Sequence, residues 1–463
     1  MAARSGWCAG GAMSEPRDPL DGHGILYFGN DWHAENRTSS HHVASRLARH
    51  VPLLYVSSPG MRAPSASGRD LRRMLRKLSA SLKPPTRIEE NLWHCTVPQL
   101  PFRRIPGVNL LNRWFGRWAV RRAAHKAGIR HGISWFVVPH PGFLAGRLDE
   151  SLCVYYCIDD YAAHPGVDAA LIGQRDEELS RRADLLFVAP PTLLPAKQAL
   201  NANVVASPHG VDVELFARAA ADETRVPARA SALGHPVIGY FGSLHAWIDF
   251  ELIAFLARQR PHWSFLLVGH EAVDVGELHA LSNVHFVGAQ PYAELPNWAK
   301  AFDVAIIPYK LNRQVINANP LKLREYLATG KPVVSVRNAE IEKFADVVRI
   351  ADDGPAFLAA IEAALADGSA AASARRMAAV ADQSWDRRVD AVGVGRIWIR
   401  QQAQSGTRLR IKAGMQTPLP WQSVAAWARA RTQDACGPEA RHLRRTWRRS
   451  GLGRVLRDGW ARL

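Results

Sequence analysis

No stretch of 18 or more consecutive apolar residues occurs in this sequence, although 47% of its 463 residues are hydrophobic. The longest apolar runs, such as ADLLFVAPP and SFLLVGH, are short and are interrupted by Pro or Gly. A membrane-spanning helix needs about 20 apolar residues, so we expect none. The apolar residues are instead expected to build the cores of two or three domains.

Cysteine is scarce. The chain has five cysteines, and none of them shows CxxC spacing. Cys153 and Cys157 lie four residues apart in an apolar run, which is poor geometry for zinc, so we expect reduced core cysteines in a cytoplasmic protein. Residues 1–23 lack the apolar segment of a secretory signal, and we expect a disordered leader there.

Negative charge is rare in two segments of a chain whose net charge is +17. Residues 396–463 hold fifteen Arg or Lys against three acidic residues, and residues 103–131 hold no Asp or Glu. A nucleic-acid-binding protein usually carries its charge on the folded core, with aromatic residues placed to stack on bases. Charge at the periphery suits anionic lipid as well. We therefore expect an anionic membrane surface as a partner and no specific nucleic acid, while non-specific RNA binding by the tail stays open.

The chain does contain a repeated alternation of apolar strands and helices. The first half begins with the strand, helix and strand of HGILYFGNDW, RTSSHHVASRLARH and VPLLYVSS, and the second half repeats this order from PVIGYFGSL to VVRIAD. The alternation predicts two α/β domains with doubly wound parallel sheets, whose ligands bind at the carboxyl ends of the strands. We place them at 24–216 and 235–395, with a linker at 217–234 and a basic helical tail at 396–463.

One segment of the second half, NANPLKLREYLATGKPVVSV, predicts a helix that binds an anion. Asn319 is a good N-cap, and Pro320 suits the first helical position. Gly330 and Pro332 end the helix. Because buried strands precede and follow it, the unit is a βαβ crossover whose helix N-terminus can bind an anion. Lys322 in the first turn would add a full positive charge.

Five motifs, in order, resemble the donor-binding domain of GT-B glycosyltransferases, in the family-4-like (group 1) set that includes teichuronic-acid-type enzymes. They are SPHGVDVELF, VIGYFGSLHAWIDFELI, FLLVGH, VHFVGAQPYAELPNWAKAFDVAIIPY and NPLKLREYLATGKPVVS. YYCIDDY and NDWHAENRTSSHHVASRLA resemble first-domain segments of the same set. The likeness covers residues 24–395 and implies two Rossmann-like domains that face a cleft. It also implies transfer of a sugar from a nucleotide diphosphate sugar to a lipid-linked or surface-polysaccharide acceptor, without a metal or other cofactor and with retained stereochemistry.

Such a transfer builds negative charge on the leaving diphosphate, which fixed dipoles and cations must stabilise where no metal does so. The helix start at Asn319 offers free N–H groups, and Lys322 adds charge. By the resemblance, Glu325 binds the ribose hydroxyls; alternatively it is a solvated helix residue paired with Lys322 or Arg324, and Lys322 is a surface lysine. The expected donor-site residues are Gly242, Ser243, His245, Asn317, Asn319, Pro320, Leu321, Lys322 and Glu325.

In the first domain, the resemblance places Asn30, Asp31 and Arg37 beside the acceptor and the diphosphate. His140 follows a strand toward the cleft, where related enzymes keep a functional His; local hydrogen bonding is the alternative. His209 takes a position usually held by Asn, and we expect it to be structural.

Two adjacent carboxylates, Asp159 and Asp160, follow another first-domain strand. Adjacent residues of a strand point to opposite faces, so at most one of them faces the cleft, for acceptor binding or base work. The catalytic candidates are His140, Asp160 and Lys322.

Two departures from the family bear on catalysis. Asn317 stands where the family has a Glu, and the loop GSLHAWIDF lacks the usual Arg and Lys. By the resemblance, Lys322 takes the place of the missing charged groups, together with Arg313 or Lys310 on the preceding loop. These losses leave the stereochemical outcome open and make a catalytically inactive sugar-nucleotide-binding scaffold an alternative. A nicotinamide oxidoreductase would also fit two α/β domains, but no GxGxxG follows a first strand.

The segment 108–126 predicts a helix with an unusual surface. Val108, Leu111, Phe115 and Ala119 lie on one side, with Trp and five basic residues around them. This pattern is typical of an interfacial helix, although a core-packed helix with a solvated basic face also fits it. Together with the Trp- and Arg-rich tail at 396–463, the helix predicts a protein held peripherally at the inner membrane face.

Overall fold

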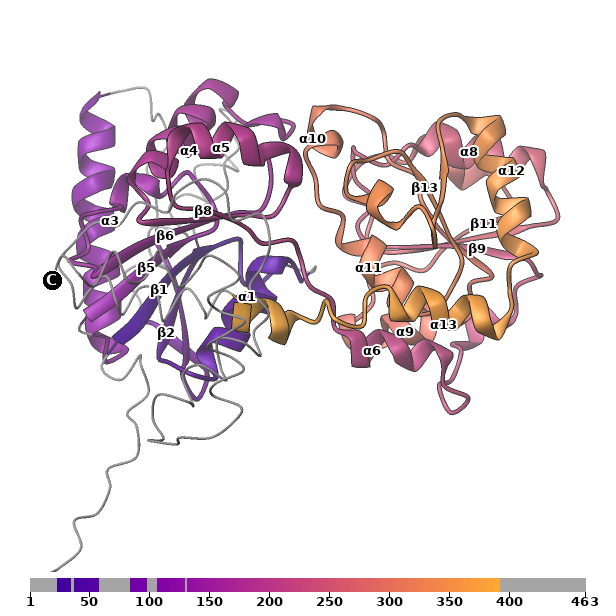
Figure 1. Ribbon diagram of the computed structural model, residues 1–463, viewed down its shortest axis with the longest axis horizontal. Coiled ribbons are helices and arrows are strands. Elements are labelled where there is room, and N and C mark those ends of the chain that lie inside the picture. Colours follow the sequence, from indigo (N-terminus) through magenta and orange to yellow (C-terminus); the bar gives the residue numbers. More distant parts are fainter. Residues whose placement is uncertain (1–22, 35–36, 58–83, 98–105, 130, 392–463) are drawn as a thin grey trace, which may run out of the picture. The chain divides into compact units, whose positions relative to one another are not determined.

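Two sheets with covering helices make up the described part of the protein in the computed structural model (Figure 1). Both sheets belong to one compact unit of the chain. The prediction of two α/β domains with doubly wound sheets is confirmed. The structure describes residues 23–34, 37–57, 84–97, 106–129 and 131–391, so residues 1–22 of the expected leader and the expected basic tail at 396–463 lie outside it.

The first sheet winds outward from its central strand β1 in both directions. Its eight strands follow the order β3-β4-β2-β1-β5-β6-β7-β8, and all are parallel except β3. Strands β2 and β6 are buried along their whole length, as expected where helices cover both faces of a parallel sheet. The strands are β1 His23–Gly29, β2 Leu53–Ser57, β3 Thr86–Glu89, β4 Leu92–Thr96, β5 His131–Phe136, β6 Leu152–Cys157, β7 Leu185–Val188 and β8 Val204–Ala206.

The second sheet has six parallel strands in the order β11-β10-β9-β12-β13-β14. The winding direction reverses between β9 and β12, and the carboxyl ends at such a reversal form a crevice for ligands. The strands are β9 Val237–Phe241, β10 Ser264–Val268, β11 Val284–Phe286, β12 Val304–Ile307, β13 Val333–Val336 and β14 Arg349–Ala351.

Helices cover both sheets, and short helices also occupy the expected linker at 217–234, where η4 spans Arg218–Ala220. The helices of the first domain are α1 Ser39–Ala48, α3 Pro106–Lys126, α4 Ala169–Arg182 and α5 Leu194–Leu200. Those that follow are α6 Val213–Ala217, α7 Ala228–Ser231, α8 Phe250–Gln259, α9 Leu295–Lys300, α10 Arg313–Ile316, α11 Leu321–Ala328, α12 Gly354–Leu365 and α13 Ala370–Ala378.

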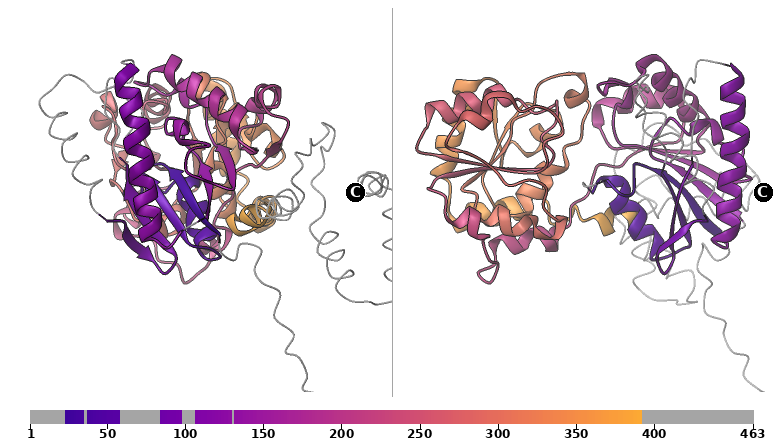
Figure 2. Two further views of the ribbon diagram at one scale, coloured as in Figure 1. Left: turned by 90° about the vertical axis from the view of Figure 1, so that its left-hand side faces the viewer. Right: turned by 180° about the vertical axis from the view of Figure 1, so that it is seen from behind.

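The first sheet separates two buried clusters. Tyr27 and Tyr55 point to the face that α1 covers, while Leu26 and Phe28 point to the opposite face, which α3 covers with residues such as Val120. The alternation follows from the two-residue repeat of strand side chains. Figure 2 shows α3 lying across this outer face. The free cysteines Cys153 and Cys157 are buried in the same cluster as Phe28.

Helix α3 buries a different side than the sequence suggested. Val120 and Ala123 pack into the first domain, but the apolar side predicted from the sequence is divided, because Ala119 is buried and Leu111 is 54% exposed. The helix therefore presents large apolar side chains to solvent.

The end of the described chain returns to the first domain. Trp385 is 1% exposed, belongs to the same buried cluster as Tyr27, and stacks on His42 of α1 at 5.0 Å between ring centroids. Gly210 leaves the space for it, because a Cβ atom there would lie 2.9 Å from Trp385 atoms.

Judged by length and apolar composition, none of the described helices could cross a membrane by itself. Only α12 and α13 taken together meet both criteria, and these two helices are bent by 115° relative to each other.

Candidate functional site

A cavity of about 360 Å³ lies at the carboxyl ends of strands from both sheets. Its first-domain walls follow β1 and β6, and its second-domain walls follow β9 and β12 and include the start of α11. The polar residues that line it are Asn30, Arg37, Thr38, Ser39, Asp159, Tyr161, His164, His209, Ser243, Gln290, Tyr292, Tyr309, Gln314, Asn319, Lys322 and Glu325.

The N-terminus of α11 forms one side of this cavity. Its N-cap is Pro320, which makes no side-chain capping hydrogen bond, so the expectation that Asn319 is the N-cap is wrong. The Asn319 side chain instead donates to the carbonyl of Ala189 at 3.0 Å and accepts from Arg324 at 2.7 Å. With the Asn319 side chain turned away, the first-turn N–H groups are offered to a ligand.

Arg324 anchors the opposite face of α11. It is 1% exposed, pairs with Glu340 and donates to Gln383 at 2.7 Å. A buried charge needs such partners, and these come from elements far along the chain. At the other end of the helix, Gly330 adopts φ +75, and a Cβ atom there would lie 2.2 Å from the Ser373 hydroxyl, so glycine ends the helix as predicted.

Glu325 is a buried carboxyl in the wall of the cavity. Its residue exposure is 8%, and the Tyr292 hydroxyl lies 3.5 Å from its Oε1 atom. Burial raises the pKa of Glu325 to about 7, while the nearby Lys322 acts in the opposite direction. The interpretation of Glu325 as a solvated residue of the helix surface is therefore wrong.

Lys322 lies over the end of β9. Its Nζ atom is 5.6 Å from the centre of the Tyr240 ring. Gly242 makes this position possible, because it adopts φ +131 and a Cβ atom there would lie 2.2 Å from the Lys322 Cε atom. The cation is thus held beside the uncapped start of α11.

The loop after β9 contributes part of the expected donor-site set. Ser243 and Trp247 line the cavity, whereas His245 does not and instead stacks on Trp247 at 4.0 Å. Gly242 donates its backbone N–H to Val268 at 2.7 Å, which fixes the loop on the neighbouring strand β10.

The loop after β1 contributes Asn30 and Arg37, but Asp31 does not line the cavity. The Arg37 guanidinium lies 5.2 Å from the Trp32 ring centre. The loop is held by β2, where Ser57 accepts from the Trp32 N–H at 3.0 Å and Tyr55 donates to the Asn30 carbonyl at 2.9 Å.

The adjacent carboxylates after β6 diverge. Asp160 is 9% exposed, does not line the cavity, and accepts from Arg313 at 2.9 Å and from Asn317 at 3.0 Å. Asp159 lines the cavity and pairs with His164 at 2.8 Å. One carboxylate faces the cavity, as predicted, but it is Asp159 rather than the candidate Asp160.

His164 was missed by the sequence reading, although it also lines the cavity. The available signal was its position five residues after Asp159, across the turn η2 at Tyr161–Ala163. His140 is 6% exposed and does not line the cavity. His209 does line it; burial lowers its pKa to about 3, so the ring is neutral and suits the expected structural role.

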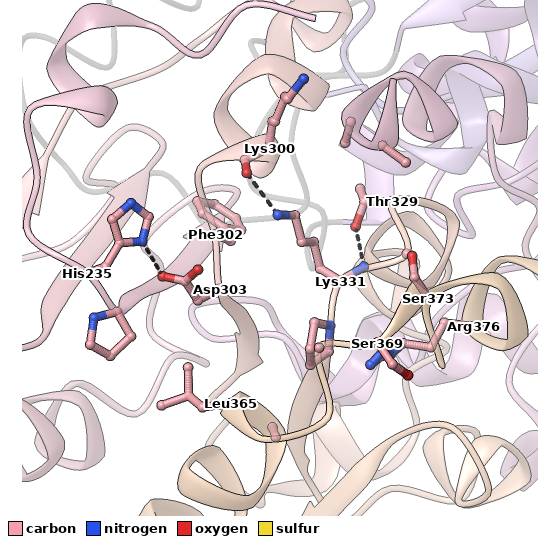
Figure 3. Close-up of a pocket in the computed structure, with 17 residues that line it drawn as sticks. His235, Lys300, Phe302, Asp303, Thr329, Lys331, Leu365, Ser369, Ser373 and Arg376 are labelled. Atoms are coloured by element: carbon pink, nitrogen blue, oxygen red, sulfur yellow. Dashed lines mark hydrogen bonds and ion pairs between the residues drawn. The ribbon is translucent and has the colours of Figure 1, made fainter. Parts of the chain in front are cut away.

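A second cavity, of about 780 Å³, lies at the amino ends of β9, β12 and β13 (Figure 3). Figure 3 shows the Lys331 ammonium directed at the Lys300 carbonyl, 2.8 Å away, and His235 facing Asp303 at 2.6 Å. These polar groups bind one another. Because ligands of such sheets bind at the carboxyl ends, the smaller cavity is the candidate site.

Within the described ranges, no group of three or more His, Cys, Asp or Glu side chains is placed to hold a metal ion. The cations that the described cavity wall offers to an anion are Arg37 and Lys322.

The sequence is similar to a known family and to a curated relative. Residues 235–372 match the family described as Glycosyl transferases group 1. TuaH of Bacillus subtilis (strain 168), named for a glycosyltransferase role in teichuronic acid biosynthesis, is 28% identical over 218 residues, which are 43% of this chain and 54% of TuaH. The chain therefore matches about half the length of this relative.

Solved structures share the fold. Sucrose-phosphate synthase from Thermosynechococcus elongatus matches with a TM-score of 0.59 and 16% identity, over 83% of this chain and 100% of that one. Anabaena HepE, solved in complex with UDP and glucose, matches with a TM-score of 0.55 and 15% identity, over 82% of this chain and 98% of that one. At these identities the likeness concerns the fold, which is that of GT-B glycosyltransferases.

Proposed function

We propose that this chain, whose residues 235–372 match the group 1 glycosyl transferases, moves a sugar from a nucleotide diphosphate sugar to a lipid-linked or surface-polysaccharide acceptor. One observation carries the proposal: a single cavity joins an uncapped helix N-terminus, a cation and a buried carboxyl. These are the groups that a diphosphate and a ribose require. The name of TuaH, which refers to teichuronic acid biosynthesis, supports a polysaccharide acceptor.

The diphosphate would lie at the start of α11. Breaking the bond between the sugar and the diphosphate leaves an electron pair and a growing negative charge on the leaving oxygen. The N–H groups of the first turn and the Lys322 ammonium oppose this charge from one side, and Arg37 lies across the cavity. We propose that these fixed groups act without a metal. By the family resemblance, the sugar keeps its anomeric configuration.

The ribose would lie against Glu325. Two neighbouring hydroxyls can each donate a hydrogen bond to one carboxylate oxygen. Such bonds favour the ionised form of a carboxyl whose pKa burial has raised to about 7. Nucleotide binding should therefore release a proton near neutral pH, and it should strengthen as the pH rises through about 7.

An anionic membrane surface would hold the enzyme beside a lipid-linked acceptor, at the cytoplasmic face. The support is the solvent face of α3, where Leu110, Leu111, Trp114 and Trp118 are 67%, 54%, 68% and 42% exposed. Amphipathic helices with Trp, Leu and basic residues bind membrane interfaces in this way. The basic side chains of this helix are Arg113, Arg117, Arg121, Arg122 and Lys126, of which Arg117 and Arg121 face Asp149.

Vesicle co-sedimentation tests this surface. The protein should pellet with vesicles that contain phosphatidylglycerol and remain in solution with pure phosphatidylcholine. The double variant Trp114→Ser/Trp118→Ser should lose most of the binding, because it removes two exposed anchors. Val205→Ser is the matched control, since Val205 is 39% exposed on another element. Equal pelleting of the double variant and the wild type would exclude α3 as the contact.

Thermal shift against nucleotides tests the transferase proposal. UDP, GDP, ADP, dTDP and CMP are compared with NAD, because a ligand that binds only the folded state raises the melting temperature. One nucleotide diphosphate should raise the midpoint of the wild type and of Glu251→Ala, whose exposed side chain lies on α8 away from the cavity. Glu325→Ala should lose the shift. No shift with any diphosphate, or a shift with NAD alone, would contradict the proposal.

A further inference from the structure

We propose that Asp159 and His164 form the site that receives the attacking hydroxyl group of the acceptor, an inference that rests on the proposed function. Both residues line the cavity that contains Lys322 and Glu325. The acceptor hydroxyl of a sugar transfer must approach the donor within this cavity. The pair stands on the first-domain wall, together with Arg37, whereas Lys322 and Glu325 stand on the second-domain wall.

The pair has the geometry of an oriented imidazole. The Nε2 atom of His164 lies 2.8 Å from Oδ2 of Asp159, and the two side chains are 24% and 25% exposed. The Oδ1 atom of Asp159 accepts the N–H of Asp160 at 2.8 Å, so the carboxylate cannot rotate freely. Tyr161, whose ring lies 5.4 Å from that of His164, packs beside the imidazole.

The hydrogen bond to Asp159 selects one form of the imidazole. An ionised carboxylate only accepts hydrogen bonds, so Nε2 of a neutral His164 carries the hydrogen. The other ring nitrogen, Nδ1, is then an acceptor. An alcohol donates its hydrogen to such a nitrogen and keeps an oxygen lone pair for the anomeric carbon. His164 thus binds the nucleophile, and Asp159 is a positioning residue that acts through it.

A His–carboxylate pair elsewhere in the described chain makes a similar contact outside the cavity. His279 lies 2.8 Å from Glu271 in the second domain, but neither residue lines the cavity. This pair has the same contact distance and no access to the site. It is therefore the control for what a His–carboxylate contact contributes to the fold alone.

Two substitutions separate an acceptor site from a local structural link across η2. His164→Ala removes the acceptor nitrogen. Asp159→Asn keeps a hydrogen bond to the ring, but its direction is reversed. The Asn oxygen keeps the bond from the Asp160 N–H, so the NH2 group faces Nε2 and donates to it, and the ring hydrogen moves to Nδ1. A structural link survives Asp159→Asn, whereas a site for a donating hydroxyl does not.

The experiment measures consumption of the donor and nucleotide affinity in parallel. The donor is the sugar form of whichever nucleotide diphosphate raises the melting temperature, with water and a panel of alkyl glycosides as the acceptors. We expect His164→Ala and Asp159→Asn to lower turnover about 100-fold or more, because a misplaced reactant costs about 100-fold and a lost proton acceptor about 100- to 10,000-fold. Affinity for the nucleotide diphosphate should stay within about 2-fold of the wild type, and His279→Ala should behave as the wild type.

The outcomes distinguish this inference from the proposed function. Wild-type turnover in Asp159→Asn, with nucleotide binding intact, would overturn the acceptor site and leave the transferase proposal standing. A wild type that binds the nucleotide but consumes no donor with either kind of acceptor would also overturn it. A wild type that binds no nucleotide diphosphate would instead contradict the proposed function itself.

Discussion

The two walls of the cavity hold their carboxyl groups in different ways. Glu325 lies on a helix, is 8% exposed, and has a pKa raised to about 7 by burial. Asp159 lies on a turn after β6, is 25% exposed and contacts His164. The buried Arg324 and its hydrogen-bond partners fix the helix that carries Glu325. The Glu325 carboxyl is therefore held in one position, which suits a ligand of constant shape such as the nucleotide. On the other wall, the partly exposed Asp159–His164 pair suits the hydroxyl groups of acceptors, which enter the cavity, give up a proton and leave with the product.

This difference suggests that the two walls bind different substrates. The second-domain wall would recognise the nucleotide, which is common to every turnover, with rigid and desolvated groups. The first-domain wall would receive the acceptor with groups that remain open to solvent. Three predictions bear on this comparison.

The largest expected effect concerns stability and pH at Glu325. Its folded pKa is raised from 4.5 to about 7, so the stability linked to this carboxyl is fully present below pH 4.5 and is lost as the pH rises through about 7. The shift corresponds to about 3 kcal/mol. Relative to the wild type, Glu325→Gln should therefore gain up to about 3 kcal/mol in unfolding free energy between pH 4.5 and pH 8.

Chemical denaturation of both proteins across this pH range measures the gain. The difference between the two curves is the relevant quantity, because the neutral histidines His42 and His209 act with the opposite sign. Burial lowers both of their pKa values to about 3, so the stability linked to them is lost as the pH falls below 6.5. A difference curve that is flat between pH 4.5 and pH 8 would show that Glu325 is not desolvated.

The next effect concerns charge on the second-domain wall. Lys322→Ala should weaken the nucleotide diphosphate by about 2 kcal/mol, roughly 30-fold, because hydrogen bonds to charged groups contribute about 1.5–3 kcal/mol. Affinity for the matching nucleoside, which has no phosphate, should change little. Titration calorimetry with both ligands tests this, and Lys310→Ala is the control because Lys310 is exposed and does not line the cavity. An equal loss for nucleoside and diphosphate would remove Lys322 from the phosphate site.

The smallest effect concerns Arg313, which connects the two domains through Asp160. The Arg313 side chain is 69% exposed, so its ion pair is screened by water and should contribute less than about 1 kcal/mol. Arg313→Ala should lower the melting temperature only slightly. The double variant Arg313→Ala/Asn317→Ala should lower it more than the sum of the single changes, because Asp160 is only 9% exposed and would lose both partners. Strict additivity would mean that the Asp160 carboxylate needs neither partner.

Much of the fold follows from sequence patterns, because buried parallel strands are apolar runs and helices are bounded by local signals. Gly330 ends α11 as predicted for this reason. Asn319 shows the limit: its cap propensity is real, but Arg324 and the Ala189 carbonyl, which lies 130 residues away, compete for the side chain. Propensity describes a local preference, and a long-range hydrogen bond can override it.

The candidate site shows the same limit. Strand geometry predicted that Asp159 and Asp160 diverge, yet it could not tell which of the two faces the cavity. The answer depends on Arg313 and Asn317, which reach Asp160 from the second domain. His164 could not be predicted for a related reason, because it lies in a turn without periodicity and only the fold brings it into the same cavity as Glu325.

Because Trp385, near the end of the described chain, packs in the first domain, the coding sequence cannot simply be cut between the two domains. A fragment that ends before Trp385 would remove a large, fully buried side chain from the core beside the first sheet. Loss of a buried Trp side chain lowers the free energy of unfolding by about 3–5 kcal/mol. A free-standing first half is therefore a poor unit for expression, for swapping between relatives or for fusion. Exchange of acceptor or donor specificity by recombination would have to carry residues 384–391 along with the first sheet.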